Sequence, residues 1–359
     1  MQYYCMKTGM ETFDVSRAYG FGLLLDALKE EEEDAVAISD WGIYYLIGGP
    51  LIKKYDPDRI FVLFDSDSSG LHWKETFLTS SQRKIKVELK PATKKKIKRA
   101  EEVVRSQLKQ IFIDYSKPIP IKIHDSKGET LLQSMEFAAT KGYRVPIRSK
   151  VSYTEGSSLK VPQKEWALAV LGEAHLSIWK FGEGLVSIIP QPQKVKVMNW
   201  RGIRSSIDVG KLNSVSVSAT LSHIAVLLAH GLQKRKQSGD SFIDKFSSLV
   251  YGGMVSAGRG QWKPNKGGLF PMDFLYNLID SNLEISGEIF DLWDKVFQVG
   301  NRKGCEDVAV SLSEFIAHPT LDNWERYQRI HLRYLLDEEI KIRAYPEECI
   351  KEVMKNVGG

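Results

Sequence analysis

The spacing of hydrophobic and polar positions changes along the chain and divides it into two parts. Up to about residue 205, short runs alternate β-branched or aromatic residues with polar ones, which predicts strands. From residue 206 onward, apolar residues recur every three or four positions, as in amphipathic helices. We therefore expect an α+β (or α/β) domain over residues 1–205 and an all-α helical bundle over residues 206–359.

The first part combines predicted strands with two predicted helices. One helix is expected at 15–29, with Thr12 or Asp14 as its N-cap, and the other at 93–115. The predicted strands are 35–39, 60–64, 84–89, 118–124, 176–181 and 185–190.

The second part contains predicted helices separated by Gly, Pro, Ser or Asn. They are 214–236, 240–252, 271–282, 286–300, 306–318, 320–342 and 345–357. Residues 251–271 are expected to form a glycine-rich basic loop inserted in the bundle, because residues 251–268 hold six glycines and no acidic residue.

Charge is distributed unevenly along the chain, although the net charge is only +5. Residues 1–271 contain 40 Lys and Arg against 28 Asp and Glu, whereas residues 272–359 contain 10 against 17. A basic first part indicates a polyanionic partner, and an acidic last part indicates contact with protein or water. The alternative is a surface rich in Lys and Glu, as in thermophiles.

Two classes of protein are disfavoured by composition. No apolar run reaches the ~18 residues of a membrane span, and the N-terminus lacks the basic-then-apolar order of a signal peptide, so we expect a cytoplasmic protein. Cys5, Cys305 and Cys349 are far apart and form no Cys-x-x-Cys pair. We therefore expect neither a structural zinc nor a disulfide framework, and no cofactor or metal.

The motifs of known enzyme classes are incomplete in this sequence. Asp65 and Asp67 follow a predicted strand and suit Mg²⁺, but no later strand end supplies a further acidic residue. A metal-dependent nuclease or phosphotransferase using these two residues is the alternative function. His223 and His230 lie seven apart on one apolar helix, which suits core histidines better than ligands. We expect no catalytic residues and a protein that is not an enzyme.

Three basic stretches predict nucleic-acid contacts. Residues 83–122 hold 13 Lys and Arg against 4 acidic residues, and residues 193–211 place cations around Trp200, an aromatic suited to base stacking. The predicted contacts with the nucleic-acid backbone are Lys94, Lys95, Lys96, Lys98, Arg99, Arg201 and Arg204. A lysine-rich surface helix remains the alternative for the first stretch.

The glycine-rich segment is the third stretch. Glycines allow a backbone to approach a ligand closely, and the polar side chains here suit base edges or phosphates, while a tryptophan can stack or wedge. The alternative is a flexible connector between helices. The predicted DNA contacts are Arg259, Gln261, Trp262, Lys263, Asn265 and Lys266.

Three segments carry a family resemblance. "GMETFDVSRAYGFGLLL" (9–25), "VPQKEWALAVLGEAHLSIWKF" (161–181) and "SLSEFIAHPTLDNWERYQRIHLRYL" (311–335) resemble the large subunit of type I CRISPR-associated Cascade complexes, most closely the archaeal I-A subtype. The resemblance implies an α/β domain followed by a helical bundle, without chemistry of its own.

The resemblance also implies a role in antiviral defence. Such a subunit binds the 5′ part of the CRISPR RNA (crRNA), recognises the protospacer-adjacent motif in double-stranded target DNA, promotes duplex opening and docks the helicase-nuclease. The implied partners are crRNA, target DNA, the helicase-nuclease and the backbone, crRNA-end and small subunits. The acidic second part departs from this pattern: either it has a local positive face at residues 233–236, or it mainly contacts protein subunits.

Overall fold

The chain forms two compact units. The computed structural model describes residues 1–30, 34–59, 91–121, 129–130, 160–181, 184–240, 244–256, 262–337, 340 and 342–357. The first unit comprises 1–178, 187–202 and 250–268, and the second comprises 179–186, 203–249 and 269–359.

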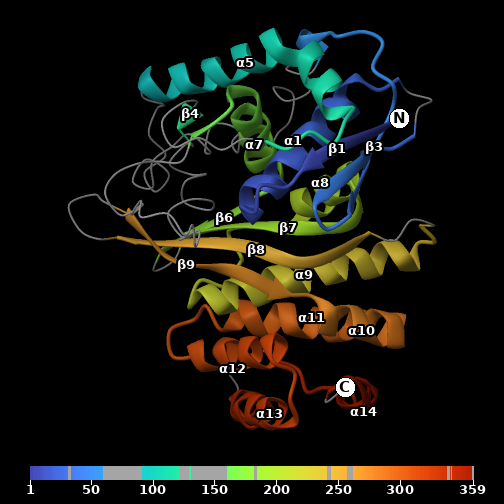
Figure 1. Cartoon of the computed structure of the whole chain (residues 1–359). Helices are drawn as coiled ribbons and strands as arrows, with labels where there is room; N and C mark the ends of the chain where they lie inside the picture. The colour runs from blue at the N-terminus through green and yellow to red at the C-terminus, as the bar shows by residue number, and fades with distance from the viewer. Residues whose placement is uncertain are drawn as a thin grey trace. The chain divides into compact units, whose positions relative to one another are not determined.

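Most strands belong to one seven-stranded sheet (Figure 1). Its order is β1-β3-β2-β7-β8-β9, with β6 paired to β7, and a separate two-stranded sheet pairs β4 with β5. The strands are β1 (Gln2–Met6), β2 (Ala37–Asp40), β3 (Tyr44–Gly48), β4 (Glu129–Thr130), β5 (Lys160–Val161), β6 (Ile178–Phe181), β7 (Gly184–Lys196), β8 (Lys245–Ser256) and β9 (Trp262–Pro271).

Side-chain alternation explains how the first strands join the core. Tyr3 and Cys5 of β1 are buried, and Tyr45 and Ile47 of β3 are buried at the matching positions of the antiparallel pair. The Tyr3 ring meets Phe21 edge-on with 5.2 Å between the centroids. This period-two pattern gives the sheet one apolar face that packs against helices.

Helices make up the rest of the described fold. Up to residue 206 these are α1 (Glu11–Leu28), α5 (Pro91–Tyr115), α7 (Gln163–Leu176) and α8 (Val197–Ser206). Beyond it they are α9 (Val217–Gln237), α10 (Asp273–Ser281), α11 (Leu283–Val299), α12 (Glu306–Ala317), α13 (Leu321–Leu335) and α14 (Glu347–Asn356). The predicted fold class, an α+β part followed by a predominantly helical part, is confirmed.

Helices α1 and α7 are in backbone contact at two glycines (Figure 1). A Cβ atom at Gly20 would lie 1.8 Å from the Leu168 carbonyl oxygen, and one at Gly172 would lie 1.8 Å from the Ser16 carbonyl oxygen. No heavy atom approaches a Cβ so closely, so each helix requires glycine where the other crosses it. The two glycines therefore set the distance between these helices.

A buried ionic cluster also joins α1 to α7. Arg17 is fully buried and pairs with Asp14 and with Glu165, both at 3.2 Å. The Tyr115 hydroxyl of α5 donates to Glu165 at 2.5 Å. Burial, together with the negative charge of Glu165, raises the pKa of Tyr115, so this phenol stays protonated. The cluster links three helices through one buried cation.

The second unit is built around α9 and α11. Its aromatic core includes Phe290, Trp293, Phe315 and Trp324, with 4.9 Å between the Phe315 and Trp324 ring centroids. Helices here begin at polar caps: the Ser216 hydroxyl accepts the Ala219 N–H at 3.1 Å, and Asn282 and Thr320 cap α11 and α13 in the same way.

Several local predictions were wrong. The N-cap of α1 is Met10, and Asp14 instead accepts the backbone N–H groups of Thr8 and Gly9. The predicted helix at 240–252 is contradicted by β8, in which Lys245 and Ser247 are exposed while Phe246 and Ser248 are buried, the alternation of a strand.

Other sequence predictions concern individual segments. Residues 118–121 lie in no strand, and the predicted strands at 60–64 and 84–89 fall outside the described residues.

All three cysteines are free and buried, and burial raises the pKa of the Cys5 thiol to about 12. None of the described helices combines the length and the apolar content needed to cross a lipid bilayer.

Candidate nucleic-acid interface and polar cavity

The glycine-rich segment predicted as a loop lies largely in two neighbouring strands. Residues 251–256 belong to β8 and residues 262–271 to β9, so the prediction of a loop over 251–271 was wrong. Strand β9 is the last strand of the sheet order among the described residues. Gly268 packs against the Tyr251 ring, with its Cβ position 3.5 Å from Cε1. Gly267 and Gly268 are therefore strand residues of β9 rather than part of a flexible connection.

Most of the predicted DNA contacts belong to β9. They are Trp262, Lys263, Asn265 and Lys266. Arg259 and Gln261 lie outside the described residues.

The predicted phosphate contacts of the first basic stretch lie on the N-terminal half of α5. The C-terminal half of this helix buries Val104, Leu108, Ile111 and Phe112. The predicted contacts within the N-terminal half are Lys94, Lys95, Lys96, Lys98 and Arg99. Helix α5 therefore combines an anchored half with a cationic half.

The second basic stretch differs from its prediction. Trp200 is fully buried and its indole N–H donates to the Leu176 carbonyl at 3.0 Å, so the prediction that it stacks on bases was wrong. Arg204 is 5% exposed, which removes its guanidinium from a surface contact with phosphate. Arg201 is half-buried, and its Nη1 lies 3.9 Å from the Met198 sulfur.

Cations at residues 233–236 are mostly neutralised by acidic neighbours. Arg235 pairs with Asp240 at 2.5 Å, and Lys236 pairs with Asp280 at 2.9 Å. Gln233 is buried and donates to the Leu283 carbonyl. This pairing argues against a local positive face at residues 233–236.

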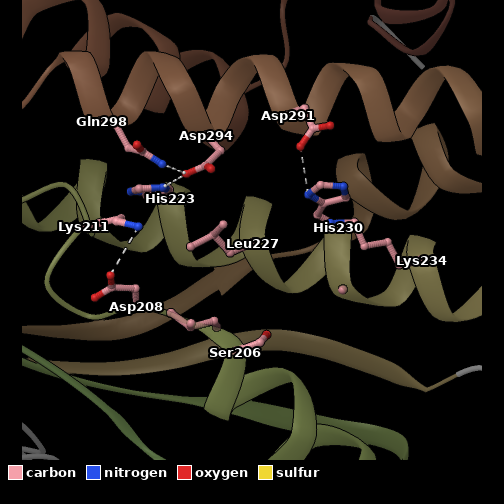
Figure 2. Close-up of a pocket in the computed structure, with 12 residues that line it drawn as sticks. Ser206, Asp208, Lys211, His223, Leu227, His230, Lys234, Asp291, Asp294 and Gln298 are labelled. Atoms are coloured by element: carbon pink, nitrogen blue, oxygen red, sulfur yellow. Dashed lines mark hydrogen bonds and ion pairs between the residues drawn. The ribbon is translucent and has the colours of Figure 1, made fainter.

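A polar cavity of about 340 Å³ lies between α9, α11 and the segment after α8 (Figure 2). His223 and His230 of α9 are buried, as the sequence predicted, yet both line this cavity beside Asp291, Asp294 and Gln298 of α11. Sequence reasoning missed the cavity because these acidic partners lie about 60 to 70 positions further along the chain, with no local motif linking them.

Hydrogen bonds fix one end of the cavity. The His223 Nδ1 accepts the Asn213 backbone N–H at 2.9 Å, so its Nε2–H donates to Asp294 Oδ1 at 2.7 Å. Gln298 donates to the same oxygen at 2.9 Å. Burial raises the pKa of Asp294, but the hydrogen bonds from His223 and Gln298 outweigh it and hold the pKa below its usual range. Asp294 is therefore a stable carboxylate.

At the other end, His230 Nδ1 lies 3.6 Å from Asp291 Oδ1, too far for a hydrogen bond. Burial and the nearby Lys234 cation lower the pKa of His230, so its imidazole is neutral at pH 7. Across the part of the chain that the structure describes, no three His, Cys, Asp or Glu side chains are grouped to hold a metal ion. Asp65 and Asp67, the alternative metal ligands, lie outside it.

Comparison with known proteins places the chain beside an archaeal relative. An Archaeoglobus fulgidus protein described as an uncharacterized protein is 38% identical over 367 residues, covering 99% of this chain and 98% of the relative. The chain belongs to that protein's family. No protein-family model matches the chain. Family membership extends over both units, because the matched region spans nearly the whole of both proteins.

Proposed function

We propose that the protein is a non-catalytic, nucleic-acid-binding subunit of an RNA-guided CRISPR interference complex of the Cascade type. The observation that carries the proposal is the pair of neighbouring strands β8 and β9, which spans a cationic segment free of acidic residues. Several DNA-binding folds place strands of a ribbon or a sheet in a groove of duplex DNA, and β9 is the last strand of this sheet among the described residues.

The proposal assigns different roles to the two faces of β9, because successive positions of a strand alternate between its faces. Lys263 and Asn265 carry the two side-chain types that hydrogen-bond to guanine and adenine edges, so their shared face reads the short motif beside the target. Trp262 and Lys266, on the opposite face, pack against the sugar-phosphate wall or wedge at a base step. Sequence recognition beyond the motif belongs to base pairing with the RNA.

Helix α5 supplies the contacts that do not depend on sequence. Lys94, Lys95, Lys96, Lys98 and Arg99 form a cationic helix end that neutralises phosphates of crRNA or target DNA. Its apolar C-terminal half holds this end on the first unit. Lysines act as point charges and read no bases, so this element contributes affinity rather than motif preference.

The helical unit suits contacts with other proteins of the complex. Leu332 and Leu336 of α13 and its C-terminal end are 54% and 86% exposed, and Ile350 and Met354 of α14 are 37% and 39% exposed. Exposed apolar side chains spaced by four residues form stripes typical of subunit interfaces. The partners proposed for this unit are other Cascade subunits and the helicase-nuclease.

Gel-shift titration with duplexes that differ only at the adjacent motif tests the reading face. In a complex reconstituted with crRNA, Lys263→Ala and Asn265→Ala are each expected to weaken motif-dependent binding by ~1–3 kcal/mol. Lys245→Ala is the matched control, because this exposed lysine begins β8 and lies outside the glycine-rich segment 251–268. Wild-type motif preference in both β9 variants contradicts the proposed role of this face.

A further inference from the structure

The cavity of the helical unit combines hydrogen-bond acceptors, cations and an apolar floor (Figure 2). Asp291 and Asp208 provide carboxylates on opposite sides, Lys234 and Lys211 provide ammonium groups, and Leu227 covers the floor between them. Its volume of about 340 Å³ falls within the range of small-molecule sites, roughly 300–1,000 Å³. The lining is too mixed in charge for a purely anionic or purely cationic ligand.

His230 is the group in this cavity that points to a ligand. Its side chain is 10% exposed, it projects into the cavity, and it forms no hydrogen bond with the described residues. The tautomer that turns Nδ1–H toward Asp291 leaves Nε2 as an acceptor. A ligand that donates a hydrogen bond to this nitrogen gains affinity from it.

The opposite end of the cavity is already ordered. Asp294 is held by His223 and Gln298, and His223 is itself fixed by the Asn213 backbone. These bonds keep α9 and α11 at a set spacing without a ligand. From His223 to His230, α9 rises by about 10 Å, which gives an elongated site with different chemistry at its two ends.

We propose that this cavity binds a ribonucleoside monophosphate. The ribose cis-diol donates hydrogen bonds to the Asp291 carboxylate and to His230 Nε2, as carboxylates do with ribose in dinucleotide-binding folds. The phosphate pairs with Lys234, which lies one helical turn beyond His230. The base lies over Leu227 toward Asp208 and Lys211, whose charges are 3.6 Å apart and offer both an acceptor and a donor.

This site is separate from the proposed nucleic-acid interface, since none of its residues belongs to β8, β9 or α5. Because the two sites share no residues, failure of one proposal leaves the other standing. A free nucleotide and the phosphorylated end of an RNA carry the same chemistry, so the experiment includes both sources of the ligand.

Isothermal titration calorimetry on the full chain tests the site with the four ribonucleoside 5′-monophosphates, their 2′-deoxy forms and inorganic phosphate. We expect at least one ribonucleotide to bind with a Kd below about 1 mM, and its 2′-deoxy form to bind about tenfold or more weakly. Inorganic phosphate alone is expected to bind more weakly still. A short 5′-phosphorylated RNA that binds more tightly than the mononucleotide identifies an RNA end as the source.

Two variants each remove one proposed contact with the ligand, and a third variant is the control. Asp291→Asn is expected to abolish the difference between ribo and deoxy forms, and Lys234→Gln to weaken the monophosphate about tenfold while leaving the unphosphorylated nucleoside unchanged. Lys236→Gln, on the same helix but paired with Asp280 outside the cavity lining, is the control and is expected to bind normally. Both cavity positions are exposed, so these substitutions leave the fold intact.

Absence of binding by every ribonucleotide and by the RNA at about 1 mM overturns the proposal. Equal affinity for ribo and deoxy forms in the wild type also overturns it. So does a Kd that Asp291→Asn and Lys234→Gln leave unchanged, because the ligand then lies elsewhere.

Discussion

Replacing Gly172 by alanine tests the backbone contact between α1 and α7. The added methyl group would lie 1.8 Å from the Ser16 carbonyl oxygen and 2.8 Å from the Gly20 nitrogen. Both atoms belong to the backbone, so no side-chain rotation relieves the overlap. The two helices must move apart by more than an ångström, which also disturbs the buried pairing of Arg17 with Glu165.

The expected loss follows from two opposing contributions. Overpacking a tight core costs about 1–3 kcal/mol, and more where the backbone cannot shift. Alanine is the better helix former and returns roughly 1 kcal/mol. Because the overlap here is with backbone, we expect a net decrease of about 2–3 kcal/mol in the free energy of unfolding. Gly202→Ala is the control: its Cβ meets no atom within 4 Å, so the helix gains stability.

Alkylation of Cys5 along a urea gradient reports on the unit concerned. Cys5 is fully buried and lies in the first unit, whereas Cys305 and Cys349 lie in the second. Mass spectrometry of the modified peptides is expected to show Cys5 labelling at lower urea in Gly172→Ala and at equal or higher urea in Gly202→Ala. If Gly172→Ala is as stable as the wild type, α1 and α7 are not in the backbone contact described above.

Three further perturbations have defined outcomes. Arg17→Met leaves two buried carboxylates without a cation and should lower the free energy of unfolding, measured in urea, by about 3–5 kcal/mol. A second change, Glu165→Gln, should restore part of this loss. Full stability of the single variant contradicts the buried ionic cluster. Burial lowers the pKa of His331 to about 4, below its ordinary value of 6.5, so the unfolded chain takes up a proton first as the pH falls. Stability should therefore decline between pH 6.5 and pH 4 by up to about 3 kcal/mol, and thermal melting should show a shallower decline in His331→Phe; equal slopes refute this origin. Replacing Lys94, Lys95 and Lys98 by glutamine should flatten the salt dependence of nucleic-acid binding without changing motif preference, and an unchanged slope excludes α5 from the contact.

Helices with strong periodicity were predictable from the sequence, and the ends of most of them were close. Helix α9 begins after Ser216, a residue type that caps helices, and α5 ends at Tyr115 as expected. The C-terminal helices bury wide apolar stripes at helical spacing, so local pattern and tertiary environment agree there.

Strand β8 shows where local pattern failed. Apolar residues at 242, 243, 246, 249 and 250 match helical spacing, yet Lys245 and Ser247 are exposed and Phe246 and Ser248 buried. Short segments satisfy both periods, and pairing with neighbouring strands decides between them. The glycines of this region were interpreted as a sign of a flexible loop, although Gly267 and Gly268 lie in β9.

Contacts between distant segments could not be predicted from one sequence. Trp200 stands among cations in the sequence, but its ring is enclosed by the core and its N–H is bound to the Leu176 carbonyl. His223 meets Asp294, which lies 71 positions away, and no local spacing signals that pair. The chemistry of the cavity therefore becomes visible only in the folded chain.

Purification of the protein from its native cells, followed by sequencing of any bound RNA, tests the central claim most directly. The proposed function predicts that the chain copurifies with other protein subunits and with short RNAs that share one common 5′ sequence and differ in the remainder. Native complexes without RNA, or RNA without such a common end, contradict membership of an RNA-guided interference complex.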